Sequence, residues 1–176
     1  MIMIAIEIPD GVRVEIKDNA VSVQGSLGTN QRTFNKNLLF VKKADNKIEI
    51  DFVKSKKLQE KAEKVEKAFK KELENDIQGV GKYFEKKMKI VFAHFPITAI
   101  VKENNFYINN MIGERVPRIA KIVGSTKIEV KGQEVRLYGT KLDDVSQTAA
   151  NIIKTCKIRD KDGRVFQDGL YYDTGE

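Results

Sequence analysis

The residues best suited to bind a ligand are the cations near the C-terminal end of the chain. They fall between positions 154 and 164: Lys154, Lys157, Arg159, Lys161 and Arg164. Only Asp160 and Asp162 oppose them, and cations of this kind pair with phosphate oxygens. Phe166, Tyr171 and Tyr172 follow, and an exposed aromatic ring can stack on an unpaired base or sugar. Neighbours on a strand face opposite sides, so only one of the two tyrosines can face the ligand. The pattern indicates RNA contact; the alternative is a solvated loop whose rings pack on the protein.

A second group of cations contains Arg115, Arg118 and Lys121. Pro117 lies between the two arginines, and proline within a sheet is confined to edges and irregular segments. Side chains on such a segment can reach outward, so we predict phosphate contacts for all three cations. The alternative is that they are edge-strand charges that prevent sheets from associating.

Few residues are suited to catalysis or metal binding. The chain has one histidine, His94, and one cysteine, Cys156, and neither has partners at the spacing of a metal or nucleophile site. We interpret His94 as a structural residue and Cys156 as a buried thiol. The segment 25–28 (GSLG) lacks the pattern of a phosphate-binding loop and is predicted to be a hairpin turn. We therefore expect no catalytic residue, no metal and no cofactor.

Composition narrows the class of protein further. The 176 residues are 41% hydrophobic and 32% charged, which is enough apolar material for a core and argues against disorder. Lys and Arg number 32 against 25 Asp and Glu, and the net charge of +7 favours a polyanionic partner. No apolar run approaches the roughly 18 residues of a membrane-spanning helix, and the first residues lack signal-peptide features. A single cysteine suits a reducing compartment, so we expect a cytoplasmic protein.

An internal repeat predicts how these residues are positioned. At an offset of 85 residues, Val21, Val23, Leu27 and Gly28 fall on Phe106, Ile108, Ile112 and Gly113. Both stretches follow an apolar residue and a proline, and both precede a helical pattern. We interpret this as a duplication, with one repeat over 1–84 and another over 85–176. The alternative is chance similarity between two generic strand–turn–strand segments.

Each repeat is predicted to be a small, mainly antiparallel sheet packed on one helix, an α+β fold. Alternating apolar and charged residues predict strands over 12–16 and 48–52, and a hairpin over 127–137. Apolar residues at helical spacing are Leu58, Ala62, Val65, Phe69 and Leu73 in the first repeat, and Leu142, Val145, Ala149, Ile152 and Cys156 in the second. The first helix also carries Glu63–Lys67 and Glu66–Lys70 pairs, which indicate a solvated face.

Several segments resemble one known family. Residues 89–97 (KIVFAHFPI) resemble the KVVYAHFPI signature of large-subunit ribosomal protein six in its archaeal and eukaryotic form. Residues 113–118, 147–152 (QTAANI) and 164–171 (RVFQDGLY) follow in the family's order, while 8–12 (IPDGV) and 23–28 (VQGSLG) resemble its first domain. The resemblance covers nearly the whole chain. It is looser over 54–85, and Ser146 stands where many relatives have glycine.

The resemblance implies a duplicated α+β fold and a structural role in the large ribosomal subunit. It implies binding to large-subunit rRNA, chiefly through the second domain, close to the sarcin–ricin region and the stalk base. Neighbouring ribosomal proteins would be further partners, and translational GTPases would dock nearby, with no membrane or small-molecule substrate. Our hypothesis is a non-catalytic rRNA-binding protein. The alternatives are a protein–protein adaptor that docks through its Lys/Glu-rich helix, and a small RNA-processing enzyme that uses His94.

Overall fold

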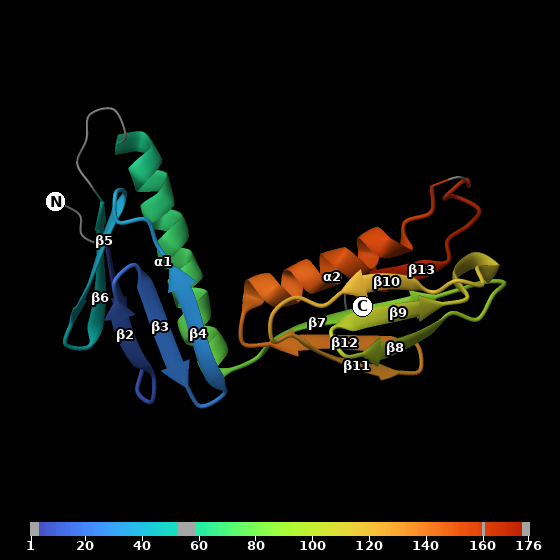
Figure 1. Ribbon diagram of the computed structural model, residues 1–176, viewed down its shortest axis with the longest axis horizontal. Coiled ribbons are helices and arrows are strands. Elements are labelled where there is room, and N and C mark those ends of the chain that lie inside the picture. The colour runs from blue at the N-terminus through green and yellow to red at the C-terminus, as the bar shows by residue number, and fades with distance from the viewer. Residues whose placement is uncertain (1–3, 53–58, 160, 174–176) are drawn as a thin grey trace. The chain divides into compact units, whose positions relative to one another are not determined.

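The chain consists of two compact units, residues 1–83 and 84–176 (Figure 1). The computed structural model describes residues 4–52, 59–159 and 161–173. Each unit packs antiparallel strands on one α-helix, so the α+β class predicted from the alternation patterns is confirmed. Each unit contains two small sheets rather than the single sheet that the sequence suggested.

The first unit contains six strands and one helix. They are β1 (Ile4–Glu7), β2 (Arg13–Lys17), β3 (Ala20–Gly25), β4 (Gly28–Thr33), β5 (Leu39–Ala44), β6 (Lys47–Phe52) and α1 (Gln59–Gly81). One sheet has the order β2-β3-β4 and the other the order β1-β6-β5. The strands predicted over 12–16 and 48–52 are confirmed as β2 and β6. The hairpin turn predicted over 25–28 is confirmed, since it joins β3 to β4 with Gly25 opposite Gly28.

The helix α1 is longer than its predicted apolar pattern, because the buried stripe continues past Leu73 through Ile77 and Val80. Leu58 and the side chain of Ala62 lie outside the described part of the chain. The solvated face differs from the prediction at Glu66, whose side chain is buried, with only 4% of the residue exposed. Lys70 pairs instead with Glu74, at 3.7 Å.

The buried carboxylate of Glu66 is expected to weaken the first unit at neutral pH. Its Oε1 has no hydrogen-bond partner in the described part of the chain, and burial, followed by repulsion from Asp51, raises its pKa. A carboxyl group whose pKa is raised on folding stabilises the fold at low pH, and that contribution is lost as the pH rises past about 4.5. We expect Glu66→Gln to raise the free energy of unfolding by about 1 kcal/mol at pH 7.

This gain in the free energy of unfolding should shrink below pH 4.5 in urea unfolding measurements. Glu15→Gln, on an exposed side chain, is the control; an equal gain in both variants would contradict the assignment to burial.

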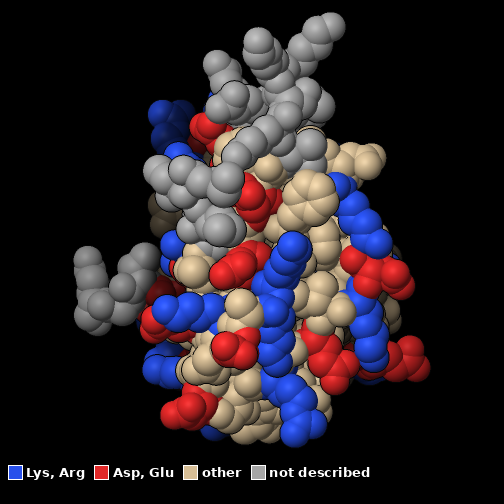
Figure 2. Space-filling view, turned by 90° about the vertical axis from the view of Figure 1, so that its left-hand side faces the viewer, with Lys and Arg blue, Asp and Glu red and all other residues tan. Residues whose placement is uncertain are grey.

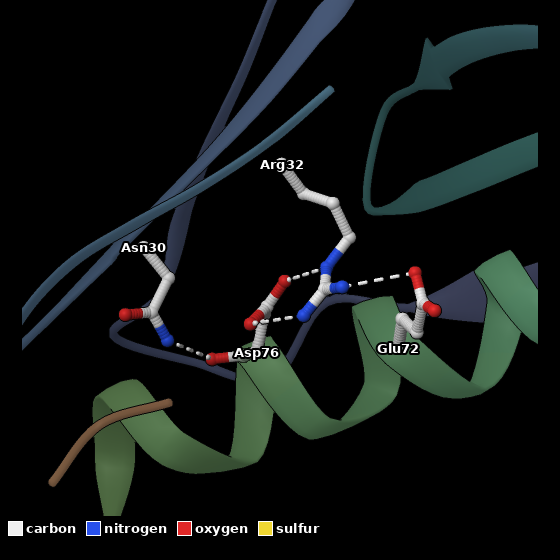
Figure 3. Close-up of polar contacts among 4 residues, drawn as sticks. All are labelled: Asn30, Arg32, Glu72 and Asp76. Atoms are coloured by element: carbon white, nitrogen blue, oxygen red, sulfur yellow. Dashed lines mark hydrogen bonds and ion pairs between the residues drawn. The ribbon is translucent and has the colours of Figure 1, made fainter. Parts of the chain in front are cut away.

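A partly buried ion-pair network connects α1 to the sheet β2-β3-β4 of the first unit. Arg32 on β4 points toward the helix, where Nε donates to Asp76 at 2.6 Å and Nη1 donates to Glu72 at 2.9 Å (Figure 3). The side chain of Asp76 is only 2% exposed. Asn30, two residues earlier on β4, donates to the main-chain carbonyl of Asp76 at 3.4 Å. These bonds fix the helix across β4 and satisfy polar groups that are costly to bury alone.

The second unit has seven strands and one α-helix. They are β7 (Phe84–Val91), β8 (Thr98–Lys102), β9 (Asn105–Asn109), the short 3₁₀ turn η1 (Met111–Gly113), β10 (Arg118–Lys121), β11 (Lys127–Lys131), β12 (Glu134–Gly139), α2 (Leu142–Cys156) and β13 (Gly169–Tyr172). The strands form sheets of order β10-β9-β8 and β11-β12-β7-β13. The predicted helix over 142–156 and the predicted hairpin, now β11–β12, are confirmed. The buried stripe of α2 packs on a core that includes Phe106, Ile108 and Leu137.

Candidate nucleic-acid interface

Four of the predicted RNA-binding residues line one shallow groove at the C-terminal end of α2. The groove lies where the helix packs against the edge strand β10, and its volume is about 540 Å³. Its lining residues are Arg118, Ile119, Lys154, Thr155, Lys157 and Arg159. The first two come from β10, and the other four come from the last turn of the helix and the residues after it. Because the C-terminal end of a helix favours positive charge, the lysines and Arg159 suit this position.

Arg118 holds the two walls of this groove together. Its Nε and Nη2 donate to the two carboxylate oxygens of Glu114, at 2.8 and 2.6 Å. Its Nη1 donates to the main-chain carbonyls of Thr155, in the last turn of α2, and Lys157, just after it, at 2.9 and 3.2 Å. The hydrogen bond from Arg118 also lowers the pKa of the Glu114 carboxyl group. The guanidinium is therefore engaged within the protein, and it positions Lys157 and the chain that follows.

In the first unit, too, a strand side chain at the equivalent position donates to a main-chain carbonyl of the helix. Arg118 pairs with Ile108 across β10 and β9, and Asn30 pairs with Val23 across β4 and β3. Val23 and Ile108 are equivalent positions of the repeat, so Asn30 and Arg118 are equivalent as well. Both side chains donate to main-chain carbonyls of the helix that covers their sheet. In the second unit this position carries an arginine at the groove.

Lys154, Lys157 and Arg159 are exposed around this fixed arginine. Lys154 lies in the last turn of α2, and the main-chain N–H of Lys157 donates to its carbonyl at 3.4 Å. All three cations therefore line the same groove, where the chain leaves the end of α2. An extended polyanion that enters the groove would meet them in succession, and this arrangement suits phosphate binding.

The tail beyond Arg159 engages its cations partly with its own residues. Lys161 places its Nζ 4.8 Å from the ring centre of Phe166, which is half-buried. Arg164 donates from Nε and Nη2 to Asp162, at 3.2 and 3.0 Å, and these bonds lower the pKa of that carboxyl group. Contact with a phosphate by Arg164 would compete with an existing partner. The structure thus distinguishes Arg159 from Arg164, which the sequence treats alike.

The two tyrosines of β13 have different neighbours. The hydroxyl group of Tyr171 donates to the carbonyl of Gln167 at 3.0 Å, which directs this ring toward the tail. Tyr172 lies instead beside Lys86, with 5.3 Å between the lysine Nζ and the ring centre. Of the two, Tyr171 is therefore the one associated with the basic tail.

Three loops meet at this end of the second unit (Figure 1). Asp168, which is buried, accepts a hydrogen bond from the main-chain N–H of Ala93 at 3.0 Å. The ring of Phe95 packs against Gly113, whose φ of +77° favours glycine. The carbonyl of Pro96 accepts a hydrogen bond from Asn110 at 3.2 Å. These contacts bring the segment 92–97 beside the tail and the turn that contains Arg115.

His94, which we interpreted as a structural residue, is exposed in this loop together with Phe95. Sequence reasoning also missed Phe95, which is 43% exposed, and Val116, which is 76% exposed beside Arg115. The only signal in the sequence was their place next to Pro96 and Pro117. Proline removes a backbone donor and favours loops at the ends of strands.

Lys121 lies apart from the groove. It is at the opposite end of β10 from Arg118, and its side chain is on the other face of the strand, because Arg118 and Lys121 are an odd number of positions apart. Its main-chain carbonyl accepts a hydrogen bond from Asn151 at 3.0 Å. The structure therefore brings Arg118, Lys154, Lys157 and Arg159 together and separates Lys121 from them.

The remaining chemistry-bearing groups do not form a reactive site. Cys156 is buried on the apolar stripe of α2, as predicted, and burial raises the pKa of its thiol to about 11. Over the described ranges no group of three or more His, Cys, Asp or Glu side chains is placed to hold a metal ion. The helices described there are also too short or too polar to cross a membrane. On the face of the first unit shown in Figure 2, Lys and Arg are interspersed with Asp and Glu.

Comparison with known proteins gives one consistent family. A family model described as "Ribosomal protein L6" matches residues 95–169. The chain is 42% identical to "Large ribosomal subunit protein uL6" of Methanobrevibacter smithii, over 94% of this chain and 92% of the relative. It is 42% identical to the protein of the same name from Methanosarcina mazei, over 94% and 93% of the two chains. The corresponding protein of Staphylothermus marinus is 40% identical, over 97% and 94%.

Proposed function

Because this chain belongs to the ribosomal protein L6 family, the uL6 proteins of the large ribosomal subunit, we propose that its second unit binds large-subunit rRNA through the groove at the end of α2. As a family member the chain is a structural ribosomal protein and not an enzyme, and its place is in the cytoplasmic ribosome. The enzyme alternative based on His94 is therefore excluded.

A single observation carries the proposal: three exposed cations converge on a groove whose walls Arg118 holds together. Lys154, Lys157 and Arg159 neutralise consecutive phosphates of the rRNA backbone. The exposed His94 and Phe95, with Arg115 beside them, form the adjoining part of the surface. Phe166 and Tyr171 pack against sugars or bases where the tail meets the RNA. Lys161 and Arg164 join after exchanging their present partners, whereas Lys121, on the outward face of β10, lies outside this contact.

The family resemblance adds a location to this proposal. We propose, from this resemblance, that the second unit lies close to the sarcin–ricin region and the stalk base, with translational GTPases docking nearby. The first unit then faces neighbouring ribosomal proteins. Its mixed surface charge, visible in Figure 2, suits protein contacts better than a continuous RNA interface.

The proposal is tested by the salt dependence of binding to in vitro transcribed large-subunit rRNA. Log K, where K is the association constant, falls as log salt rises. Arg159→Ala is expected to lower the magnitude of this slope by roughly 0.7 to 0.9, which corresponds to the loss of one phosphate contact. Arg164→Ala is expected to lower it by less than half as much, because Arg164 must first give up its hydrogen bonds to Asp162. Filter binding over a range of potassium chloride concentrations measures both slopes. An unchanged slope for Arg159→Ala would remove this residue from the interface.

A further inference from the structure

The outward face of the sheet β10-β9-β8 carries an apolar row that the fold itself does not use. Ile100 on β8, Tyr107 on β9 and Ile119 on β10 lie directly opposite one another across the three strands (strands in Figure 1). Ile100 is 46% exposed and Ile119 is 53% exposed, and Tyr107 lies half-buried between them. Branched aliphatic side chains side by side on a solvent face form an exposed apolar patch, and such patches mark interaction sites.

A second row, with positive charge, runs beside the first. It lies two residues away along each strand and consists of Lys102, Asn105 and Lys121, which are paired across the same three strands. The spacing of strand residues places this row about 7 Å from the apolar one. Lys102 leans over the apolar row, with its Nζ 6.0 Å from the ring centre of Tyr107. Glu103 lies beyond this row, in the turn that joins β8 to β9.

The first unit shows that the fold does not require apolar residues at these positions. Its equivalent sheet is β2-β3-β4, and the offset of the repeat places Ser22 at the position of Tyr107. Glu15 and Gln31 are the cross-strand neighbours of Ser22, so the equivalent row consists entirely of polar residues. Both units bury their cores under the inner faces of these sheets. The apolar row is therefore specific to the second unit.

The other sheet of the second unit presents a different surface. On its outward side Arg136 pairs with Glu85 at 2.8 Å and with Glu129 at 3.8 Å. The hydroxyl group of Tyr138 donates to Glu129 at 2.9 Å. This surface has the ion-paired character of a face in contact with water. Within one unit, one sheet face thus carries ion pairs between its strands, while the other exposes two isoleucines beside two lysines.

We propose that the face formed by Ile100, Tyr107 and Ile119 docks an amphipathic, acidic α-helix of another protein of the large subunit. Residues three and four apart on a helix are 5 to 6 Å apart, close to the roughly 4.8 Å between neighbouring strands. A helix that runs along the row therefore places one apolar side chain on each strand. Acidic residues beside that apolar stripe then meet Lys102 and Lys121, which gives the charge complementarity that selects a partner.

The side chains favour protein over RNA at this face. Single-stranded RNA stacks on flat aromatic or guanidinium groups, whereas two of the three residues in the row are branched aliphatics. The one aromatic ring, Tyr107, already has Lys102 at its face. This inference rests on the place of the chain in the large subunit. Ile119 also lines the groove at the end of α2, whereas Ile100 and Tyr107 belong to the sheet face alone.

Photo-crosslinking within the subunit tests the inference. Lys102→Cys is coupled to benzophenone-maleimide and bound to large subunits from which the resident copy has been stripped with salt. Cys156 does not compete for the reagent, because its thiol is buried and its pKa is about 11. Lys157→Cys, labelled in the same way, reports on the groove. Digestion with ribonuclease or protease, followed by mass spectrometry, identifies what each probe has reached.

We expect the probe at position 102 to cross-link a protein peptide with apolar residues three and four apart and acidic residues beside them. The probe at position 157 should cross-link rRNA. Ile100→Thr with Ile119→Thr keeps the β-branched shape of the strands and should lower the protein cross-link at least about fivefold, since hydrophobic anchors dominate such interfaces. Val91→Thr, on a side chain that is 39% exposed in β7, is the matched control and should leave the yield unchanged.

Several outcomes would overturn the inference: rRNA cross-linked from position 102, no cross-link from that position, a peptide without the acidic and apolar pattern, or a yield that the two threonines leave unchanged. The failure of the proposed groove is recognised separately. In that case the probe at position 157 yields no rRNA, whereas the product at position 102 still decides what covers the sheet.

Discussion

The combined variant Lys154→Ala, Lys157→Ala and Arg159→Ala is expected to bind large-subunit rRNA about 100-fold more weakly near physiological salt. These three side chains are exposed on the rim of the groove at the end of α2, and each is proposed to neutralise one phosphate. The slope of log K against log salt should fall by roughly 2 to 3, because the counterions of three phosphates are no longer released on binding. Filter binding at several salt concentrations measures both quantities.

The matched control removes the same charge from a different place. Lys87, Lys127 and Lys131 are exposed on β7 and β11, in the other sheet of the same unit. Replacing all three with alanine should weaken binding less than about fivefold, since charges more than a Debye length from the RNA are screened. Equal losses in the two triple variants would mean that net charge, and not the groove, accounts for binding. Circular dichroism melts of both proteins confirm that the fold is retained.

Arg32→Met is expected to lower the free energy of unfolding of the first unit by about 3 kcal/mol, because it leaves the charge of Asp76 buried without its partner. The side chain of Asp76 is 2% exposed, and Arg32 supplies two hydrogen bonds to it, at 2.6 and 3.2 Å. Adding Asp76→Asn to this variant should recover most of the loss, since the unpaired charge is then removed. Hydrogen exchange of the α1 and β4 amides measures the change, and the amides of the second unit serve as an internal reference.

A surface pair in the same unit provides the comparison. Lys17 and Glu15 lie 3.3 Å apart with side chains that are 83% and 55% exposed, and exposed pairs of this kind contribute little to stability. Lys17→Ala should therefore change the free energy of unfolding by less than about 0.5 kcal/mol. If Arg32→Met had an equally small effect, the network in Figure 3 would not be what fixes α1 on its sheet.

The sequence could not predict which arginine of the tail is available to bind phosphate. Composition and spacing marked Arg159 and Arg164 as equivalent cations, since both follow the helix in a glycine-containing segment. In the structure Arg159 is part of the groove, whereas Arg164 bonds to Asp162 two residues before it. A turn that closes over so short a distance depends on local backbone angles, and the order of charges along the chain does not specify them.

Much about this protein was determined by the sequence alone. The duplication, the α+β class, the limits of α2 and the hairpin β11–β12 all follow from local periodicity, because alternating and helical patterns must place apolar side chains on one face. The family follows from ordered motifs that extend along nearly the whole chain. These properties depend on residues close together in sequence, or on the order of segments.

The tertiary structure alone decided which side chains act together. Arg118 and Lys121 lie on one strand, and the packing of α2 on one face of that strand brings the first to the helix and leaves the second on the outward face. Glu66 occupies a helical position that resembles a solvated one, and its burial follows from how α1 rotates onto its sheets. Ile100, Tyr107 and Ile119 are dispersed in the sequence and form a row only through the register of three strands. Contacts between distant segments depend on register and helix rotation, and no local pattern of residue types encodes them.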